Sequence, residues 1–199
     1  METLIPEDLK TYSIAEYLAM EDSSVEKHEF YNGKIITMPG ASPIHNLIAV
    51  NITTQLSNEL EKIESDFLVL NSDTRIHIPK FNYFLYPDAV VVCEGIQLYP
   101  GSSTVITNPL LIVEVLSPST EEHDRTYKFS DYKRIPTFKE YVLVAQTIPW
   151  VTASFKIGDK TWQDTDAEGL EASIYLKSID CTIDLKKIYR GIKFADTIK

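Results

Sequence analysis

Leu110-Leu111-Ile112-Val113-Glu114-Val115-Leu116 is an apolar run that contains one acidic residue. Its branched side chains are typical of a strand that is covered on both faces of a sheet. A second such run, Leu85-Tyr86-Pro87-Asp88-Ala89-Val90-Val91-Val92, also contains a single acid. A buried carboxylate without a partner is costly, or its pKa shifts until it is neutral. The two runs therefore predict neighbouring strands whose acids, Asp88 and Glu114, share a cation or a set of hydrogen-bond donors.

The chain after this run carries signals for both ends of a helix. Ser119-Thr120-Glu121-Glu122 fits a capping box, and its two acids favour the positive end of the helix dipole. Lys133 and Arg134 stand in the last turn, and Pro136 stops the helix. These signals predict one helix between Ser119 and Pro136.

The lengths of this strand and helix place a lysine beside the second acid. The strand from Glu114 to Ser119 spans about 16 Å at roughly 3.3 Å per residue. The helix from Ser119 to Lys128 spans about 13 Å at about 1.5 Å per residue. A helix that returns along the sheet brings Lys128 nearly level with Glu114. Asp124 and Tyr132, four residues away on either side, share its face.

The rest of the chain alternates helix and strand signals. Asn32-Gly33 between two short strand-like runs predicts a two-residue hairpin. Residues 43–62 predict a long helix with one buried stripe, made of Ile44, Leu47, Ile48, Ile52, Leu56, Leu60 and Ile63. A short helix is expected over residues 14–20. Strands are expected over residues 67–70, 75–78, 141–145, 151–157 and 160–163, and residues 183–189 favour either a short strand or a turn of helix.

Length and composition favour one domain. The 199 residues, 44% hydrophobic and 24% charged, suit one well-buried core, and we expect a single domain over residues 1–199 with its core over residues 12–190. No apolar run approaches the roughly 18 residues of a membrane span, and no basic signal-like start precedes the first helix. We therefore expect a cytoplasmic protein without a membrane partner.

The net charge of −10 bears on the class of partner. Proteins that bind nucleic acid through phosphate neutralisation normally carry a basic face. A local groove stays compatible with this charge, because metal ions at the acids would reverse the local sign. A basic stretch that includes Arg125 follows Glu114, and it consists of Arg125, Lys128, Lys133, Arg134 and Lys139. We expect any binding of DNA to be weak.

Several of these residues together resemble a known family. The motif Glu114-Val115-Leu116-Ser117-Pro118-Ser119-Thr120, followed by Asp124-Arg125, Lys128, Tyr132 and Glu140-Tyr141, with Pro87-Asp88 upstream, is similar to the Uma two family of endonuclease-like proteins. This family is a branch of the PD-(D/E)XK restriction-endonuclease-like superfamily. The segment from His28 to Ile35 and the later His45 also match. The resemblance spans about residues 12 to 190 and is most specific from Glu114 to Tyr132.

The resemblance implies an α/β (α+β) fold, with a central mixed β-sheet flanked by helices. It also implies Mg²⁺ or Mn²⁺ held by Asp88 and Glu114, and a lysine near the scissile phosphate. The usual superfamily lysine lies two residues after the second acid, and here that residue is Leu116. Lys128 would therefore be a displaced equivalent of it.

Further residues receive expected roles from the same resemblance. Glu29 is a candidate for the remaining catalytic acid. His45, Asp124 and Tyr132 would be supporting residues, which hold the metal-binding and catalytic side chains in position. Arg75 and Arg125 are candidates for contact with substrate phosphates.

Each candidate also has a structural alternative. Asp88 after a proline could end a strand, Lys128 could be a solvated helix lysine, and Glu29 could be a surface charge beside a turn. His45 could be a helix-start or core histidine, and Arg75 could pair with a carboxylate on the sheet.

Two functions from different classes follow. The first is a metal-dependent endonuclease that acts on DNA, with a homodimer as its expected assembly. The second is a module on the same fold that binds nucleic acid or protein without turnover. Hydrolysis of a glycosidic bond by Asp88 and Glu114 is disfavoured, because no aromatic sugar platform follows the strands.

Overall fold

The computed structural model describes residues 10–194. The expectation that no signal-like start precedes the first helix concerns the start of the chain, which lies outside this range. The helices are α1 (Ile14–Glu21), α2 (Pro43–Lys62), α3 (Glu121–His123), the π-helical turn η1 (Asp124–Lys128), α4 (Phe129–Tyr132) and α5 (Leu185–Ile188). The strands are β1 (His28–Tyr31), β2 (Lys34–Thr37), β3 (Leu68–Asn71), β4 (Arg75–Ile78), β5 (Tyr83–Leu85), β6 (Ala89–Val92), β7 (Val105–Ile106), β8 (Pro109–Leu116), β9 (Glu140–Ala145), β10 (Trp150–Lys156), β11 (Trp162–Glu168), β12 (Ser173–Leu176) and β13 (Cys181–Asp184).

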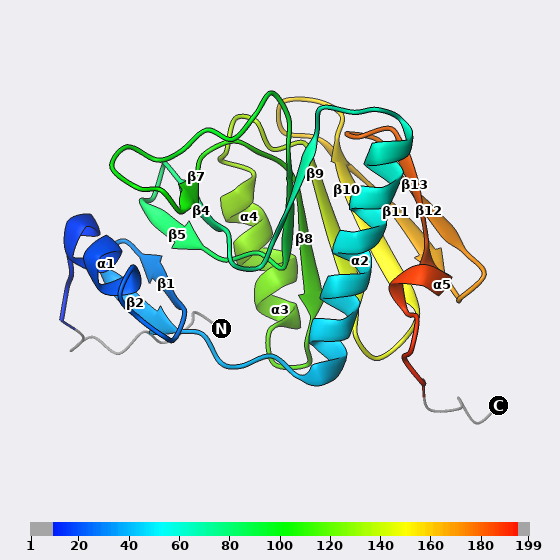
Figure 1. The fold of residues 1–199 in the computed structure, drawn as a ribbon, viewed down its shortest axis with the longest axis horizontal. Helices are drawn as coiled ribbons and strands as arrows, with labels where there is room; N and C mark the ends of the chain where they lie inside the picture. Colours follow the sequence, from blue (N-terminus) through cyan, green and yellow to red (C-terminus); the bar gives the residue numbers. More distant parts are fainter. Residues whose placement is uncertain (1–9, 195–199) are drawn as a thin grey trace.

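A six-stranded mixed sheet forms the centre of the fold, in the order β11-β10-β9-β8-β6-β3 (Figure 1). Strands β8 and β9 are parallel, and the other neighbours are antiparallel. Every residue of β6 and β8 is buried, which explains why both read as apolar runs. The α/β (α+β) fold with a central mixed sheet is therefore confirmed, and the two acid-bearing runs are neighbours.

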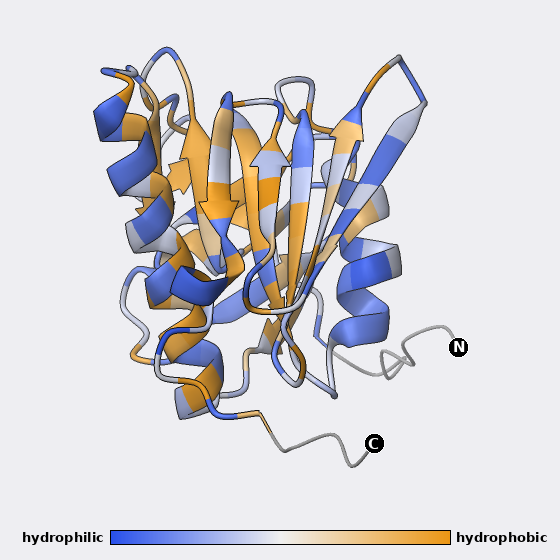
Figure 2. Cartoon of the chain, turned by 90° about the vertical axis from the view of Figure 1, so that its right-hand side faces the viewer, coloured by the Kyte–Doolittle hydropathy of each residue, from blue (hydrophilic) through white to orange (hydrophobic). Residues whose placement is uncertain are grey.

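Helix α2 covers one face of this sheet. Figure 2 shows hydrophobic residues concentrated on the sheet and hydrophilic ones on the outer sides of the helices. Four stripe residues are fully buried, namely Ile48, Ile52, Leu56 and Leu60. The stripe prediction was wrong at its ends, because Ile44, Leu47 and Ile63 are exposed. The polar Asn51 and Gln55 are buried instead, where they hydrogen-bond backbone groups of residues 184–190.

The opposite face of the sheet packs against the helical segment from α3 to α4 and against a second sheet. This second sheet has the order β2-β1-β5-β4-β7. Residues 75–78 form β4 as predicted, but they belong to this second sheet and do not continue the central one. Their side chains Ile76 and Ile78 pack with Val90 and Ile112 of the central sheet. A four-residue apolar run suits either sheet, so its sequence alone does not select one.

The hairpin of β1 and β2 turns at Asn32 and Gly33, as predicted. Both residues have positive φ, 45° and 98°, which is the backbone of a type I′ turn. Tyr31 pairs with Lys34 across it. The turn therefore fixes the register of β1, which carries Glu29.

The helix after β8 differs from its prediction in two ways. Its N-cap residue, Thr120, makes no capping hydrogen bond from its side chain, so the predicted capping box was wrong. The side chain of Thr120 instead lies 3.0 Å from the Ser117 hydroxyl. The helix also contains the π turn η1, within which the Asp124 carbonyl accepts a hydrogen bond from the Tyr141 hydroxyl at 3.0 Å. The Tyr141 hydroxyl thus donates to a helix carbonyl that, in a regular α-helix, accepts its hydrogen bond from the backbone of the same helix.

Other elements were located with small errors. The helix over residues 14–20, the strands over residues 67–70, 141–145 and 151–157, and the strand near 160–163 are all present, with shifted ends. Residues 183–189 contain both expected alternatives, the end of β13 and then α5. Strands β5, β7 and β12, which have two to four residues, were not identified from the sequence. No helix among residues 10–194 is long and apolar enough to cross a membrane.

The hairpin turn yields a stability prediction. A Cβ on Gly33 would lie 2.6 Å from Thr11 Cγ2, and its φ of 98° disfavours any side chain. Gly33→Ala should therefore lower the free energy of unfolding by about 1 kcal/mol or more, measured by urea denaturation. Gly40→Ala is the matched control, because a Cβ there meets no atom within 4 Å, and it should leave stability unchanged. Equal stability of the two variants would contradict this role of the turn.

Candidate active site

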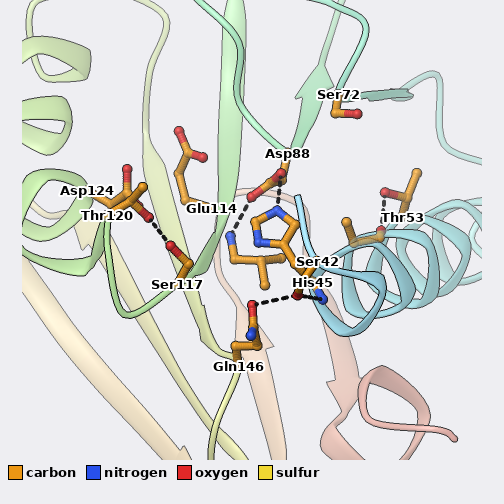
Figure 3. Close-up of polar contacts among 12 residues, drawn as sticks. Ser42, His45, Thr53, Ser72, Asp88, Glu114, Ser117, Thr120, Asp124 and Gln146 are labelled. Carbon is orange, nitrogen blue, oxygen red and sulfur yellow. Dashed lines mark hydrogen bonds and ion pairs between the residues drawn. The ribbon is translucent and has the colours of Figure 1, made fainter. Parts of the chain in front are cut away.

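A cavity of about 720 Å³ opens where the ends of the two acid-bearing strands meet the starts of α2 and α3. Five of the predicted site residues line it, namely Asp88, Glu114, Lys128, His45 and Asp124. Figure 3 shows the Asp88 carboxylate beside His45 and the Glu114 side chain on the neighbouring strand. The chain therefore brings together Asp88, directly before β6, with groups from β8, α2 and the segment after β8.

Lys128 lies beside Glu114, as the strand and helix lengths predicted. Its Nζ is 3.1 Å from Glu114 Oε1, and the Tyr132 hydroxyl donates to the same oxygen at 2.7 Å. All three residues are buried. The solvated alternative for Lys128 is thereby excluded, because its side chain is only 9% exposed.

Two further carboxylates surround the Lys128 ammonium. Glu29 Oε1 is 3.4 Å from Nζ, and Asp124 Oδ1 is 3.7 Å away. Glu29 is buried, so its surface alternative is wrong. It is held by a 2.7 Å hydrogen bond from the Tyr31 hydroxyl and one from the Tyr86 N–H. Glu29 contacts Lys128 but is not among the residues that line the cavity.

Three acids facing one cation leave an excess of negative charge in a buried place. Burial raises the pKa of Glu114 well above its usual range, and Lys128 opposes this rise. Burial also raises the pKa of Asp124. For Lys128, burial acts to lower the pKa, but the surrounding carboxylates outweigh it and hold the pKa well above its usual range. The ammonium is therefore charged, and the carboxyl groups compete for its stabilisation.

Asp88 is fixed by two groups from different elements. His45 Nε2 lies 2.8 Å from Oδ1, and the Val115 N–H donates to Oδ2 at 2.7 Å (Figure 3). Ser42 accepts a hydrogen bond from the His45 N–H at 3.1 Å and so caps the helix that carries this histidine. The first turn of α2 thus orients the Asp88 carboxylate at the cavity.

The donor set suits a hard divalent cation in combination with substrate. Lys128 and Tyr132 both contact Oε1 of Glu114, so Oε2 is the oxygen suited to a metal ion. Across residues 10–194, no three His, Cys, Asp or Glu side chains are grouped to hold a metal. Mg²⁺ is commonly bound by one or two carboxylates together with waters and substrate phosphates. Asp88 and Glu114 fit that arrangement.

The two arginines predicted to bind substrate do not line this cavity. Arg75 is buried and forms a 2.6 Å ion pair with Asp22, which is the carboxylate-pairing alternative. Arg125 pairs with Glu121 at 2.8 Å and lines a separate cavity. Lys133, from the same basic stretch, lies 3.6 Å from the Phe129 ring centroid. The stretch therefore does not form one basic groove.

Other cavity residues were not identified from the sequence. Lys27 lines the cavity and pairs with Asp73 at 2.7 Å, but nothing nearby in sequence marks it as different from a surface lysine. Gln146 follows β9 and lies 3.5 Å from the Ser42 hydroxyl. Its position directly after a strand parallel to β8 was the available signal, because parallel strands end at the same edge of a sheet.

Leu116 occupies the place of the usual superfamily lysine. It is 3% exposed and packs in the hydrophobic cluster with Tyr132 and Ile112. A cation at Leu116 would be buried among apolar side chains, whereas Lys128 reaches Glu114 from the neighbouring helix. Of these two residues, Lys128 is therefore the one that contacts Glu114.

Comparisons with known proteins agree with this fold. The sequence model of the Uma2 family, described as "Putative restriction endonuclease", matches residues 14–184. Two uncharacterized proteins of Synechocystis sp. are 37% and 36% identical, over 83% and 90% of this chain and 92% of each relative. A crystal structure from Anabaena variabilis, of a "putative nuclease belonging to DUF820", superposes with a TM-score of 0.70. It has 15% identity and covers 89% of this chain and 97% of that one. The family match supports a nuclease-like role.

The buried charge cluster predicts a large effect of Lys128→Met. Without divalent ions, this change leaves carboxylates buried without their cation, and it should cost about 3–5 kcal/mol of unfolding free energy near neutral pH. The exposed Lys186, paired with the exposed Glu171, gives the control. Lys186→Met should change stability by less than about 0.5 kcal/mol.

The pH dependence of this variant has a definite sign. Because burial raises the pKa of Glu114, the folded variant keeps a proton that the unfolded chain releases above about pH 4.3. The stability that this proton contributes to the folded state is therefore fully present below that pH, and it is lost as the pH rises toward the pKa that Glu114 has in the folded variant. The free energy of unfolding of Lys128→Met, measured by urea denaturation, should therefore fall as the pH rises above about 4.3. Adding Glu114→Gln should flatten the profile, and a flat profile in the single variant would contradict the account.

Proposed function

Since this chain belongs to the Uma2 family, we propose that it is a metal-dependent endonuclease that hydrolyses phosphodiester bonds in DNA. The observation that carries the proposal is the 3.1 Å contact between Lys128 Nζ and Glu114 Oε1 at a cavity that Asp88 also lines. Two carboxylates and one ammonium around a common space are the groups that metal-assisted phosphodiester hydrolysis requires.

Asp88 and Glu114 would bind Mg²⁺ or Mn²⁺. When bound, the ion supplies Lewis-acid chemistry, because it withdraws charge from a phosphate oxygen and lowers the pKa of a water molecule. The two carboxylates hold their positions through different partners, Asp88 through His45 and Val115, and Glu114 through Tyr132 and Lys128. Such partners fix the orientation of carboxylate ligands and tune their affinity for a cation.

Lys128 has the role of stabilising charge on the scissile phosphate. Its ammonium is a point charge with three N–H donors, and it lines the cavity. Preorganised charge of this kind stabilises the additional negative charge of the transition state. Glu29 and Tyr132, which do not line the cavity, position Lys128 and Glu114. Asp124 contributes a third carboxylate beside the ammonium.

A module that binds DNA or protein without turnover is the second candidate. It is favoured by Leu116 at the usual lysine position and by the acidic net charge of −10, which predicts weak binding of phosphates. The cytoplasmic location and the homodimer stay predictions. For a dimer, edge-to-edge pairing of β11 is disfavoured, because its exposed residues include Asp164, Asp166 and Glu168, which would repel those of a second copy.

Cleavage assays test the first candidate. Purified protein should nick or cut DNA with Mg²⁺ or Mn²⁺ and not with a chelator, followed on supercoiled plasmid. Glu114→Gln and Asp88→Asn should remove the cleavage, because each replaces a charged metal ligand with a neutral amide. Lys128→Met should slow cleavage by roughly 10²- to 10³-fold. Asp73→Asn, a change at an exposed carboxylate, should retain it, and metal-dependent cleavage by Glu114→Gln would overturn the assignment.

Calorimetric titration separates the two candidates. For an endonuclease, Mg²⁺ or Mn²⁺ should bind the wild-type protein, and the affinity should fall in Asp88→Asn. His45→Ala should weaken metal binding by roughly 10- to 100-fold, because His45 orients Asp88. Binding of DNA without any heat of divalent-ion binding would instead favour the inactive module.

A further inference from the structure

A second cavity, of about 500 Å³, lies next to the candidate active site. The two cavities share Pro118 and Gln146 in their walls. The second cavity has a different chemistry, because its lining includes Trp150, Ile148 and Leu116 together with the ion pair of Arg125 and Glu121. Its volume lies in the range that holds small organic ligands. A ligand that continues from the first cavity past Gln146 would therefore meet an aromatic ring and a guanidinium.

The fold holds Trp150 in a defined orientation. Its indole Nε1–H donates to Thr152 Oγ1 and Asp166 Oδ1, both at 3.2 Å. Its backbone N–H donates to the Tyr189 hydroxyl at 3.1 Å. Trp150 lines the second cavity, and because its indole N–H is already hydrogen-bonded, the apolar ring is the part of the side chain that is left for a ligand. An aromatic ring fixed in this way can stack on a planar ligand with little loss of side-chain freedom.

Arg125 and Gln146 add polar groups to the same wall. Arg125 Nε donates to Glu121 Oε1 at 2.8 Å, and a guanidinium has five N–H donors, so further donors are available for a phosphate. Gln146 carries both a donor and an acceptor at the junction of the cavities. A planar aromatic surface, a phosphate-binding cation and an amide are the groups that recognise a nucleotide.

We propose that this second cavity is a nucleotide subsite that receives an unstacked base of the DNA strand, next to the phosphate in the first cavity. The base stacks on Trp150, the flanking phosphate pairs with Arg125, and Gln146 hydrogen-bonds the base edge. This inference rests on the proposed nuclease function. It names the substrate as single-stranded DNA or a strand with a displaced base, because a base inside a duplex cannot stack on a side chain.

Trp150 itself reports on this contact. The chain has two tryptophans, so Trp162→Phe leaves Trp150 as the only one. This protein is titrated with a short single-stranded oligothymidylate and with an abasic strand of equal charge. Ca²⁺ replaces Mg²⁺ in this titration. Ca²⁺ binds carboxylates in a flexible coordination geometry, whereas Mg²⁺ requires a nearly ideal octahedral one. Oligothymidylate should quench the Trp150 fluorescence, and the abasic strand should not.

Affinity measurements with labelled strands separate stacking from a structural role of Trp150. Trp150→Leu should bind oligothymidylate about tenfold more weakly while its affinity for the abasic strand stays unchanged. Trp150→Phe, which keeps an aromatic face, should restore most of the difference between the two strands. Equal quenching by both strands, absence of quenching, or equal losses of affinity for both strands in Trp150→Leu would overturn the subsite.

Cleavage assays on the same proteins distinguish failure of the nucleotide subsite from failure of the proposed nuclease function. Preference for oligothymidylate over the abasic strand without any Mg²⁺-dependent cleavage would keep the subsite and overturn the nuclease. Mg²⁺-dependent cleavage without that preference would keep the nuclease and overturn the subsite.

Discussion

The burial of Lys128 among three carboxylates is the interaction on which the candidate site depends. Glu114, Glu29 and Asp124 all lie within 4 Å of its ammonium. Removing these charges from water is costly, and one cation cannot balance three anions, so the cluster keeps an excess of negative charge. Burial is the main cause of the raised pKa values of Glu114 and Asp124, and the nearby carboxylates add to it, while Lys128 opposes the rise. A divalent cation beside Glu114 would reverse the local balance, because bound ions dominate the charge of such sites.

The fold assembles the candidate site from several separate elements of the chain. Strand β8 carries Glu114, and the helix after it turns back so that Lys128 reaches the same level. The β1–β2 hairpin adds Glu29 from the second sheet, and the first turn of α2 adds His45 beside Asp88. Each contribution depends on a backbone feature with its own cause, such as the positive φ of Asn32 and Gly33 or the hydrogen bond from Tyr141 to the Asp124 carbonyl. A loss of register in any of these elements would separate the charges.

The sequence allowed the centre of the site to be predicted because its signals were local. One acid in a fully apolar run and a helix of known rise per residue were sufficient to place Lys128 beside Glu114. The sheet that receives residues 75–78, and hence the ion pair of Arg75 with Asp22, depends on long-range pairing that a short apolar run does not encode. The burial of Asn51 on α2 follows from its hydrogen bonds to the carbonyls of Ile188 and Arg190, which are distant in sequence. The roles of Gln146 and Trp150 depend on cavities, which exist only after the chain has folded.

A crystal structure with Mn²⁺ is the most direct test of the central claim, because the anomalous signal of this ion identifies its position. The account predicts Mn²⁺ bound by the Asp88 and Glu114 carboxylates in the cavity, with the Lys128 ammonium still in contact with Glu114. Mn²⁺ bound elsewhere on the chain, or a cavity that stays free of Mn²⁺ at concentrations that saturate the protein in solution, would contradict it.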